Sequence, residues 1–165
     1  MTQDDWVTII FYILAAGLVG SAFAVVVLPR IVHSALSLVL VFSAIAGLYV
    51  LLQAEFIAAV QMIVYVGAVT VLFLFAIMLT HRSYAPDSNP RNSQWAVAGV
   101  VSLAVLAMLL FAISSAGWAV GGQIPADATA QIGQLMLGQY FVPFEAAAVL
   151  LLSAMIGAIV IARES

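Results

Sequence analysis

The chain has 165 residues, of which 66% are hydrophobic and 7% are charged, with a formal net charge of −3. An ordinary soluble domain is about 45–50% apolar and about 25% charged, so this chain lacks the polar residues of a water-soluble surface, and lipid is the expected solvent. Its four basic residues form no stripe for nucleic acid, and the absence of cysteine excludes disulfides, thiolate ligation of iron–sulfur clusters and cysteine nucleophiles.

Five segments are long and apolar enough to cross the hydrocarbon of a bilayer, which takes roughly 20 helical residues. In chain order they are residues 6–28, 31–52, 56–80, 95–117 and 140–162. The N-terminal flank is acidic and its apolar run is longer than that of a signal peptide, so we expect a retained helix there. The sequence therefore predicts an all-α integral membrane protein with five transmembrane helices in a single membrane domain, residues 1–165.

The arginines between these helices predict the orientation of the chain. Arginine lies after the first, third and fifth helices and is absent from the other connections; the four residues are Arg30, Arg82, Arg91 and Arg163. Connections rich in arginine remain in the cytoplasm. We therefore predict that the N-terminus is outside, in the periplasm, and that the C-terminus is cytoplasmic.

The outer loop, residues 118–139, carries one charge, Asp127, and has apolar residues spaced among polar ones. This spacing is compatible with a short helix that lies among the lipid headgroups. It is equally compatible with a loop that is covered by other subunits. The sequence leaves both alternatives open.

Glu55 and Glu145 are acidic residues near the ends of predicted helices. Both are candidate functional residues, because an ionisable side chain in a bilayer costs free energy and is often functional. Each has a plain interpretation as an acid near the positive end of its own helix dipole. The alternative is a proton relay, which the shallow position of both residues disfavours. His33 is a lone polar residue near a helix end, and no cluster has the spacing of metal ligands. We predict no catalytic, cofactor-binding or metal-binding residue in this chain.

The third helix is the most unusual segment, because polar or small residues interrupt a strongly apolar run at Gln61, Tyr65, Gly67 and Thr70. Gln61 and Tyr65 share a helix face, and a buried amide and phenol need partners from neighbouring helices. Gly67 favours either close helix packing or a local bend. Two interpretations remain open: ordinary packing through small residues, or a π-bulge, a distortion that is frequent at functional sites.

The sequence around this helix resembles a known family. The run AEF at residues 54–56 is followed by VQMIVYVGAVTVLFLF at residues 60–75, and the fifth helix reads PFE at 143–145, LLL at 150–152 and AMIGA at 154–158. These runs are similar to the signature of subunit J of NADH-quinone oxidoreductase, respiratory complex I, which is called chain 6 in mitochondria. The resemblance covers helices one to three and five, whereas the fourth helix matches only in hydropathy.

This resemblance implies a membrane-arm subunit that helps to couple quinone reduction, for example of ubiquinone, to proton translocation. FMN, the iron–sulfur clusters and the NADH site would belong to other subunits of the parent enzyme. The partners would be the lipid bilayer and other membrane-arm subunits in a hetero-oligomer, in a bacterial cytoplasmic (inner) membrane rather than a mitochondrial one.

The family also suggests roles for particular residues. Tyr65 and Gly67 match positions at which the third helix carries a π-bulge, whose switching would open or close a water path. Glu55 and Glu145 match acidic positions and are candidates for a proton path.

Two other functions remain as alternatives. One is a purely structural membrane subunit that holds its neighbours together. The other is a subunit of a related cation/proton antiporter or membrane-bound hydrogenase. A free-standing transporter is disfavoured, because the sequence has no internal repeat of the kind that many transporters have.

Overall fold

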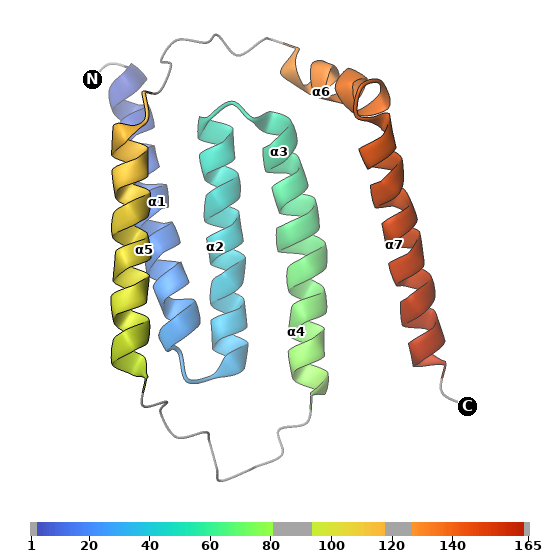
Figure 1. Ribbon diagram of the computed structural model, residues 1–165, viewed down its shortest axis with the longest axis horizontal. Helices are drawn as coiled ribbons and strands as arrows, with labels where there is room; N and C mark the ends of the chain where they lie inside the picture. Colours follow the sequence, from blue (N-terminus) through green and yellow to red (C-terminus); the bar gives the residue numbers. More distant parts are fainter. Residues whose placement is uncertain (1–2, 81–93, 118–126, 164–165) are drawn as a thin grey trace.

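The computed structural model describes residues 3–80, 94–117 and 127–163, and its regular elements there are all helices (Figure 1). In chain order they are α1 (Gln3–Val27), α2 (Ile31–Leu51), α3 (Glu55–Val60), the π-helix η1 (Gln61–Val69), α4 (Thr70–Leu79), α5 (Trp95–Ser115), α6 (Ala128–Leu137) and α7 (Phe141–Ala162).

The described residues include five helices that are long and apolar enough to span a membrane, which confirms the predicted all-α class. They are Asp5–Val27, Ile31–Leu51, Glu55–Leu79, Trp95–Ser115 and Phe141–Ala162, and their ends lie within two residues of the predicted ones. The third of these, hereafter the third span, joins α3, η1 and α4. Apolar residues lie on every face of these helices, as expected of helices that are surrounded by lipid and by other helices.

Three of the spans form a layer in which α2 lies in the middle. Helix α2 packs against α1 on one side and against the third span on the other (Figure 1). The buried residues of this layer are Ala35, Ser37 and Ala46 on α2 and Ala58, Gln61 and Thr70 on the third span. All except Gln61 are small, and small residues allow membrane helices to approach closely. Helices α5 and α7 bury none of their residues.

Short turns fix the order of the helices within this layer. At the α1–α2 turn, the Ser34 hydroxyl donates a hydrogen bond to the carbonyl of Val25. At the α2–α3 turn, Gln53 N–H bonds to the Val50 carbonyl at 3.0 Å and Ala54 N–H bonds to the Tyr49 carbonyl at 2.9 Å. This pair of bonds is a Schellman motif, which closes the end of α2.

The predicted outer loop contains a helix in its described part, α6. Figure 1 shows α6 lying across the end of the molecule at which α7 begins, and the two helices are in contact. Ile132 and Met136, which are one turn apart, are both partly buried. Residues Ala128–Leu137 are therefore helical, as the first alternative expected. Residues 118–126 lie outside the described part of the chain, as do Arg82 and Arg91.

Candidate functional site

The third span contains a π-helix at its centre, η1, and both Tyr65 and Gly67 lie within it. The N–H of Gln61 still bonds to the carbonyls of Ile57 and Ala58, as in an α-helix or a tighter turn. At the other end, the Thr70 N–H bonds to the carbonyls of Gly67 and Tyr65, three and five residues back. π-Helical turns are rare and occur frequently at functional sites. The sequence left two interpretations of this segment open, ordinary packing through small residues and a π-helical distortion, and the structure has the distortion.

Thr70 marks the junction between η1 and α4, and it is the most deeply buried polar residue of the third span. Its side chain is 1% exposed. Its hydroxyl donates to the carbonyl of Tyr65 at 2.6 Å, and the same carbonyl accepts from the Thr70 N–H, which also bonds to the Gly67 carbonyl. The sequence identified Thr70 only as a polar interruption, because the target of its hydroxyl depends on a helix register that the sequence does not reveal.

The side chain of Tyr65 meets α2 through its ring. The rings of Tyr65 and Phe42 lie 5.6 Å apart, centre to centre, in an edge-to-face arrangement with planes at 63°. Edge-to-face pairs of this kind add about 0.5–1.5 kcal/mol beyond the area that they bury. Gln61, on the same span, is 8% exposed. Tyr65 itself is 45% exposed, so of the two polar side chains that were expected to be buried only Gln61 is buried, and Tyr65 contacts α2 through its ring.

Gly67 does not mark a close contact between helices of this chain. A Cβ built there would have the Met62 carbonyl oxygen as its nearest described neighbour, at an ordinary 3.5 Å. Gly47 of α2 behaves differently, because a Cβ there would lie 3.1 Å from both methyl groups of Leu14 on α1. Packing within this chain thus accounts for Gly47, whereas it leaves Gly67 unexplained.

The two candidate glutamates lie near the same end of the molecule, where α3 and α7 begin (Figure 1). Glu55 is the first residue of α3 and lines an open groove of about 430 Å³ between α2 and the third span, together with Ser43 and Met62. Glu145 lies four residues after the start of α7, a depth of about 6 Å along the helix. Both are exposed. The structure does not bring Glu145 to the π-helix within this chain.

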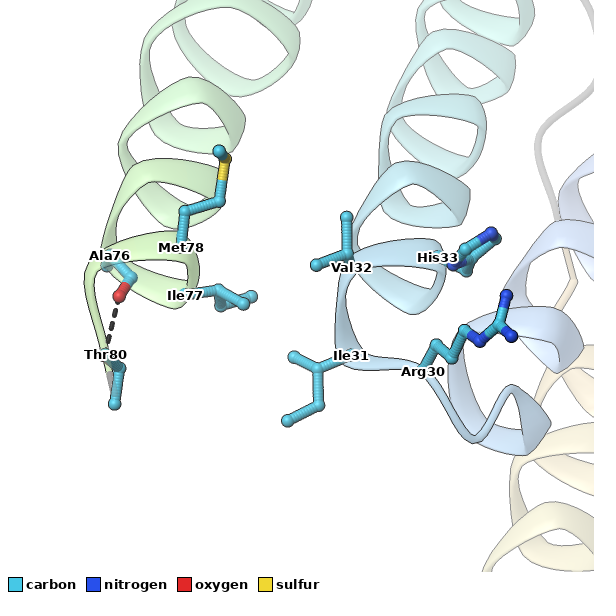
Figure 2. Close-up of a pocket in the computed structure, with 8 residues that line it drawn as sticks. All are labelled: Arg30, Ile31, Val32, His33, Ala76, Ile77, Met78 and Thr80. Atoms are coloured by element: carbon cyan, nitrogen blue, oxygen red, sulfur yellow. Dashed lines mark hydrogen bonds between the residues drawn. The ribbon is translucent and has the colours of Figure 1, made fainter. Parts of the chain in front are cut away.

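A larger cavity, of about 730 Å³, lies between the start of α2 and the end of α4. Figure 2 shows Ile31 and Val32 on one side of it and Ile77 and Met78 on the other. The side chains of Arg30 and His33 extend from the far side of α2, away from α4. The cavity is therefore apolar.

No three His, Cys, Asp or Glu side chains gather into a metal site among the residues that the structure describes.

Comparison with known proteins identifies the family. Residues 21–161 match the family described as NADH-ubiquinone/plastoquinone oxidoreductase chain 6. The chain is 46% identical to NAD(P)H-quinone oxidoreductase subunit 6 of the organellar chromatophore of Paulinella chromatophora, over 94% of this chain and 78% of the relative. It is 43% identical to NAD(P)H-quinone oxidoreductase chain 6 of Leptolyngbya boryana, over 93% and 78%.

A chloroplast protein is similar over nearly the same length. The chain is 40% identical to NAD(P)H-quinone oxidoreductase subunit 6 of Physcomitrium patens, over 94% of this chain and 84% of the relative. The matched region contains α2, the whole third span with η1, and almost all of α7. This chain therefore belongs to the NADH-ubiquinone/plastoquinone oxidoreductase chain 6 family.

Proposed function

We propose that this chain is a membrane-arm subunit of a proton-pumping NAD(P)H:quinone oxidoreductase, and that η1 helps to couple quinone reduction to proton translocation. The names of its relatives support the assembly, and the π-helix at Tyr65 and Gly67 supports the coupling role. If the widened turn tightened to an α-helical turn, the rest of the helix would rotate by about 100°, the angle of one residue. A rotation of this kind is the motion that a mechanical coupling step requires.

The exposed surface of the chain supports a hetero-oligomer. The chain exposes 13973 Å², whereas a compact soluble monomer of its mass exposes about 7,900 Å². The excess of about 6,000 Å² corresponds to several interfaces of standard size, about 800 Å² on each partner. Other membrane-arm subunits and lipid would cover this apolar surface, above all on α5 and α7, which bury no residue of their own.

The chemistry with NADH would take place in other subunits. FMN and iron–sulfur clusters carry electrons in the proposed parent enzyme, and this chain has no cysteine with which to ligate such a cluster. We assign to it no catalytic residue, and its contribution is a moving helix and a path for protons.

The proposed orientation places the N-terminus in the periplasm and the C-terminus in the cytoplasm of a bacterium. The α1–α2 turn and the end of α7 lie at the same end of the molecule in Figure 1, and Arg30 directly precedes α2 while Arg163 directly follows α7. The positive-inside rule assigns that end to the cytoplasm. Glu55 and Glu145 then lie near the periplasmic side.

We propose that Glu55 and Glu145 contribute to the proton path from that side. Glu145 is the sharper case, because it lies inside a span rather than at its first residue. A Glu145→Gln variant should lower the number of protons pumped per NADH oxidised. An unchanged ratio would reduce Glu145 to an interfacial acid.

The experiment that tests the coupling role compares two variants of Gly67 in the assembled complex. Gly67→Ala adds a Cβ with an ordinary contact to the Met62 carbonyl and should be tolerated. Gly67→Ile adds a branched side chain that crowds the same carbonyl and restricts the turn. Quinone-linked turnover and proton pumping should fall several-fold in Gly67→Ile, while NADH oxidation with an artificial electron acceptor is unchanged.

The same preparation tests the assembly itself. A tagged chain should co-purify with NADH-to-quinone activity that a quinone-site inhibitor blocks. Full turnover and pumping in Gly67→Ile would contradict the coupling role and leave a structural subunit. Purification without such activity would contradict membership of the oxidoreductase.

A further inference from the structure

Gln61 is a polar side chain that is almost completely buried in the third span. Its exposed fraction is 8%, and it lies one turn after Ala58, whose exposed fraction is 6%. Residues three apart share a side of a helix, and α2 is the neighbouring helix that packs against both α3 and η1. The stem of the Gln61 side chain is therefore covered by α2.

This side of the third span is only partly covered. Tyr65 lies one turn further along on the same side. Its ring contacts Phe42 of α2, yet 45% of the residue is exposed. The contact with α2 thus ends along the line of Gln61 and Tyr65, and beyond this line the surface of the chain is open.

The amide of Gln61 forms no hydrogen bond with any residue that the structure describes. In that part of the chain, every fully enclosed side-chain nitrogen or oxygen has a hydrogen-bond partner. The Gln61 amide is therefore not enclosed: its stem is buried, and its tip reaches the open edge beside α2. A primary amide has two N–H donors and a carbonyl acceptor, and all of them are available there.

Gln61 also lies at a depth where lipid supplies no hydrogen bond. The third span has 25 residues, which makes Gly67 its central residue. Gln61 is six residues, or about 9 Å, from that centre, whereas the hydrocarbon extends about 15 Å on each side of the middle of a bilayer. A polar group without a partner is costly at this depth, so the amide needs one from outside the chain.

A water molecule alone is a poor partner at this place. A buried water needs about two to four polar groups, whereas the residues beside Gln61 on its own span are apolar, namely Val60, Met62 and Val64. Any further chain at this depth is helical, and its backbone groups bond to one another. The group that fits the amide is therefore a side chain on a neighbouring helix.

From these observations we infer that Gln61 is an anchor for a second subunit: its amide forms a hydrogen bond with a hydroxyl, amide or carboxyl side chain on a transmembrane helix that packs beside α2 and the third span. Bonds of this kind join helices within membranes. The inference rests on the proposed function only for the identity of the complex, and it requires no movement of η1.

Electron cryo-microscopy of the purified complex tests the inference directly. A polar side chain of another subunit should lie within about 3.2 Å of Nε2 or Oε1 of Gln61. If the only neighbour of the amide is a water molecule, a lipid or a group of this chain, the inference is overturned.

Gln61→Met tests what the bond contributes, because methionine is a flexible apolar residue of similar size that has no N–H or O–H to donate. At the temperature at which half of the unaltered chain leaves the complex, the ratio of retained to released chain should fall about threefold to tenfold. Gln131→Met makes the same substitution at an exposed position of α6 and should leave this ratio unchanged. Equal ratios for the two variants would contradict the inference. If Gln61→Met does not assemble, the microscopy of the unaltered complex decides.

The activity of the same preparation separates this inference from the proposed function. A partner side chain at Gln61 in a complex without NADH-to-quinone activity would uphold the inference and contradict the proposed function. An active complex in which Gln61 meets no other subunit would do the reverse.

Discussion

Gln53 is the one non-glycine residue with a positive φ, 56°, in the described part of the chain. It occupies the left-handed position of the Schellman motif at the end of α2, where glycine is the usual residue. A side chain in this conformation costs about 1–2 kcal/mol, because its Cβ approaches the following carbonyl oxygen. The hairpin between α2 and the third span therefore contains a local strain that the sequence does not remove.

We predict that Gln53→Gly stabilises the hairpin by about 1 kcal/mol, since glycine has no Cβ to strain. The measurement is the temperature at which the purified complex releases this chain on a native gel, which should rise. Ala54→Gly is the matched control, because Ala54 has a negative φ of −91° and gains nothing from glycine. A lower release temperature for Gln53→Gly would show that the side chain of Gln53 stabilises the turn.

At the scale of elements, the corner between α6 and α7 is closed by backbone hydrogen bonds. Gly138 N–H bonds to the Gln134 carbonyl at 2.9 Å, and Tyr140 N–H bonds to the Leu135 carbonyl at 2.8 Å. A Cβ at Gly138 would lie only 2.9 Å from that Gln134 oxygen, which is a backbone atom with little freedom to move. The corner therefore needs glycine, and it sets the direction in which α7 leaves α6.

Gly138→Ala should displace this corner and lower the amount of the chain that assembles in the membrane. Gly133→Ala, inside α6, meets nothing within 4 Å and should be neutral or stabilising, because alanine favours helix by about 1 kcal/mol. Quantitative immunoblotting of purified complex measures both variants. Equal amounts of Gly138→Ala and Gly133→Ala would mean that the corner adjusts freely.

The elements also separate what a sequence can predict from what it cannot. The five spans were predictable because about 20 apolar residues have no other stable place than a bilayer. The π-helix was only one of two alternatives at Gln61 to Thr70. The two registers differ by one residue in the bonding pattern, and neither polar spacing nor Gly67 distinguishes them. The partner of Tyr65, Phe42, lies on α2 and follows from helix packing that hydropathy does not encode.

At the scale of the whole molecule, the three-helix layer of α1, α2 and the third span is the only extensive helix packing among the described residues. Its buried residues are few, and α5 and α7 contribute none. The sequence predicted these two spans from their hydropathy, but it did not predict that they bury none of their residues within the described chain, because their apolar residues lie on all sides and mark no contact face.

The orientation of the whole chain gives the last prediction, and the absence of cysteine makes it measurable with single-cysteine variants. Gln53 and Thr129 are exposed near the predicted periplasmic end, and Thr80 is exposed at the opposite end of the third span. A membrane-impermeant maleimide added to spheroplasts should label Gln53→Cys and Thr129→Cys but not Thr80→Cys. Inverted vesicles should give the reverse pattern.

Labelling after denaturation is the control, because it shows that each cysteine is reactive when no partner subunit covers it. Label on Thr80→Cys alone in spheroplasts would mean that the arginine-bearing ends face outward, against the positive-inside rule. Label on Gln53→Cys and Thr80→Cys from the same side would mean that the third span does not cross the membrane. The orientation therefore decides near which side of the membrane Glu55 and Glu145 lie.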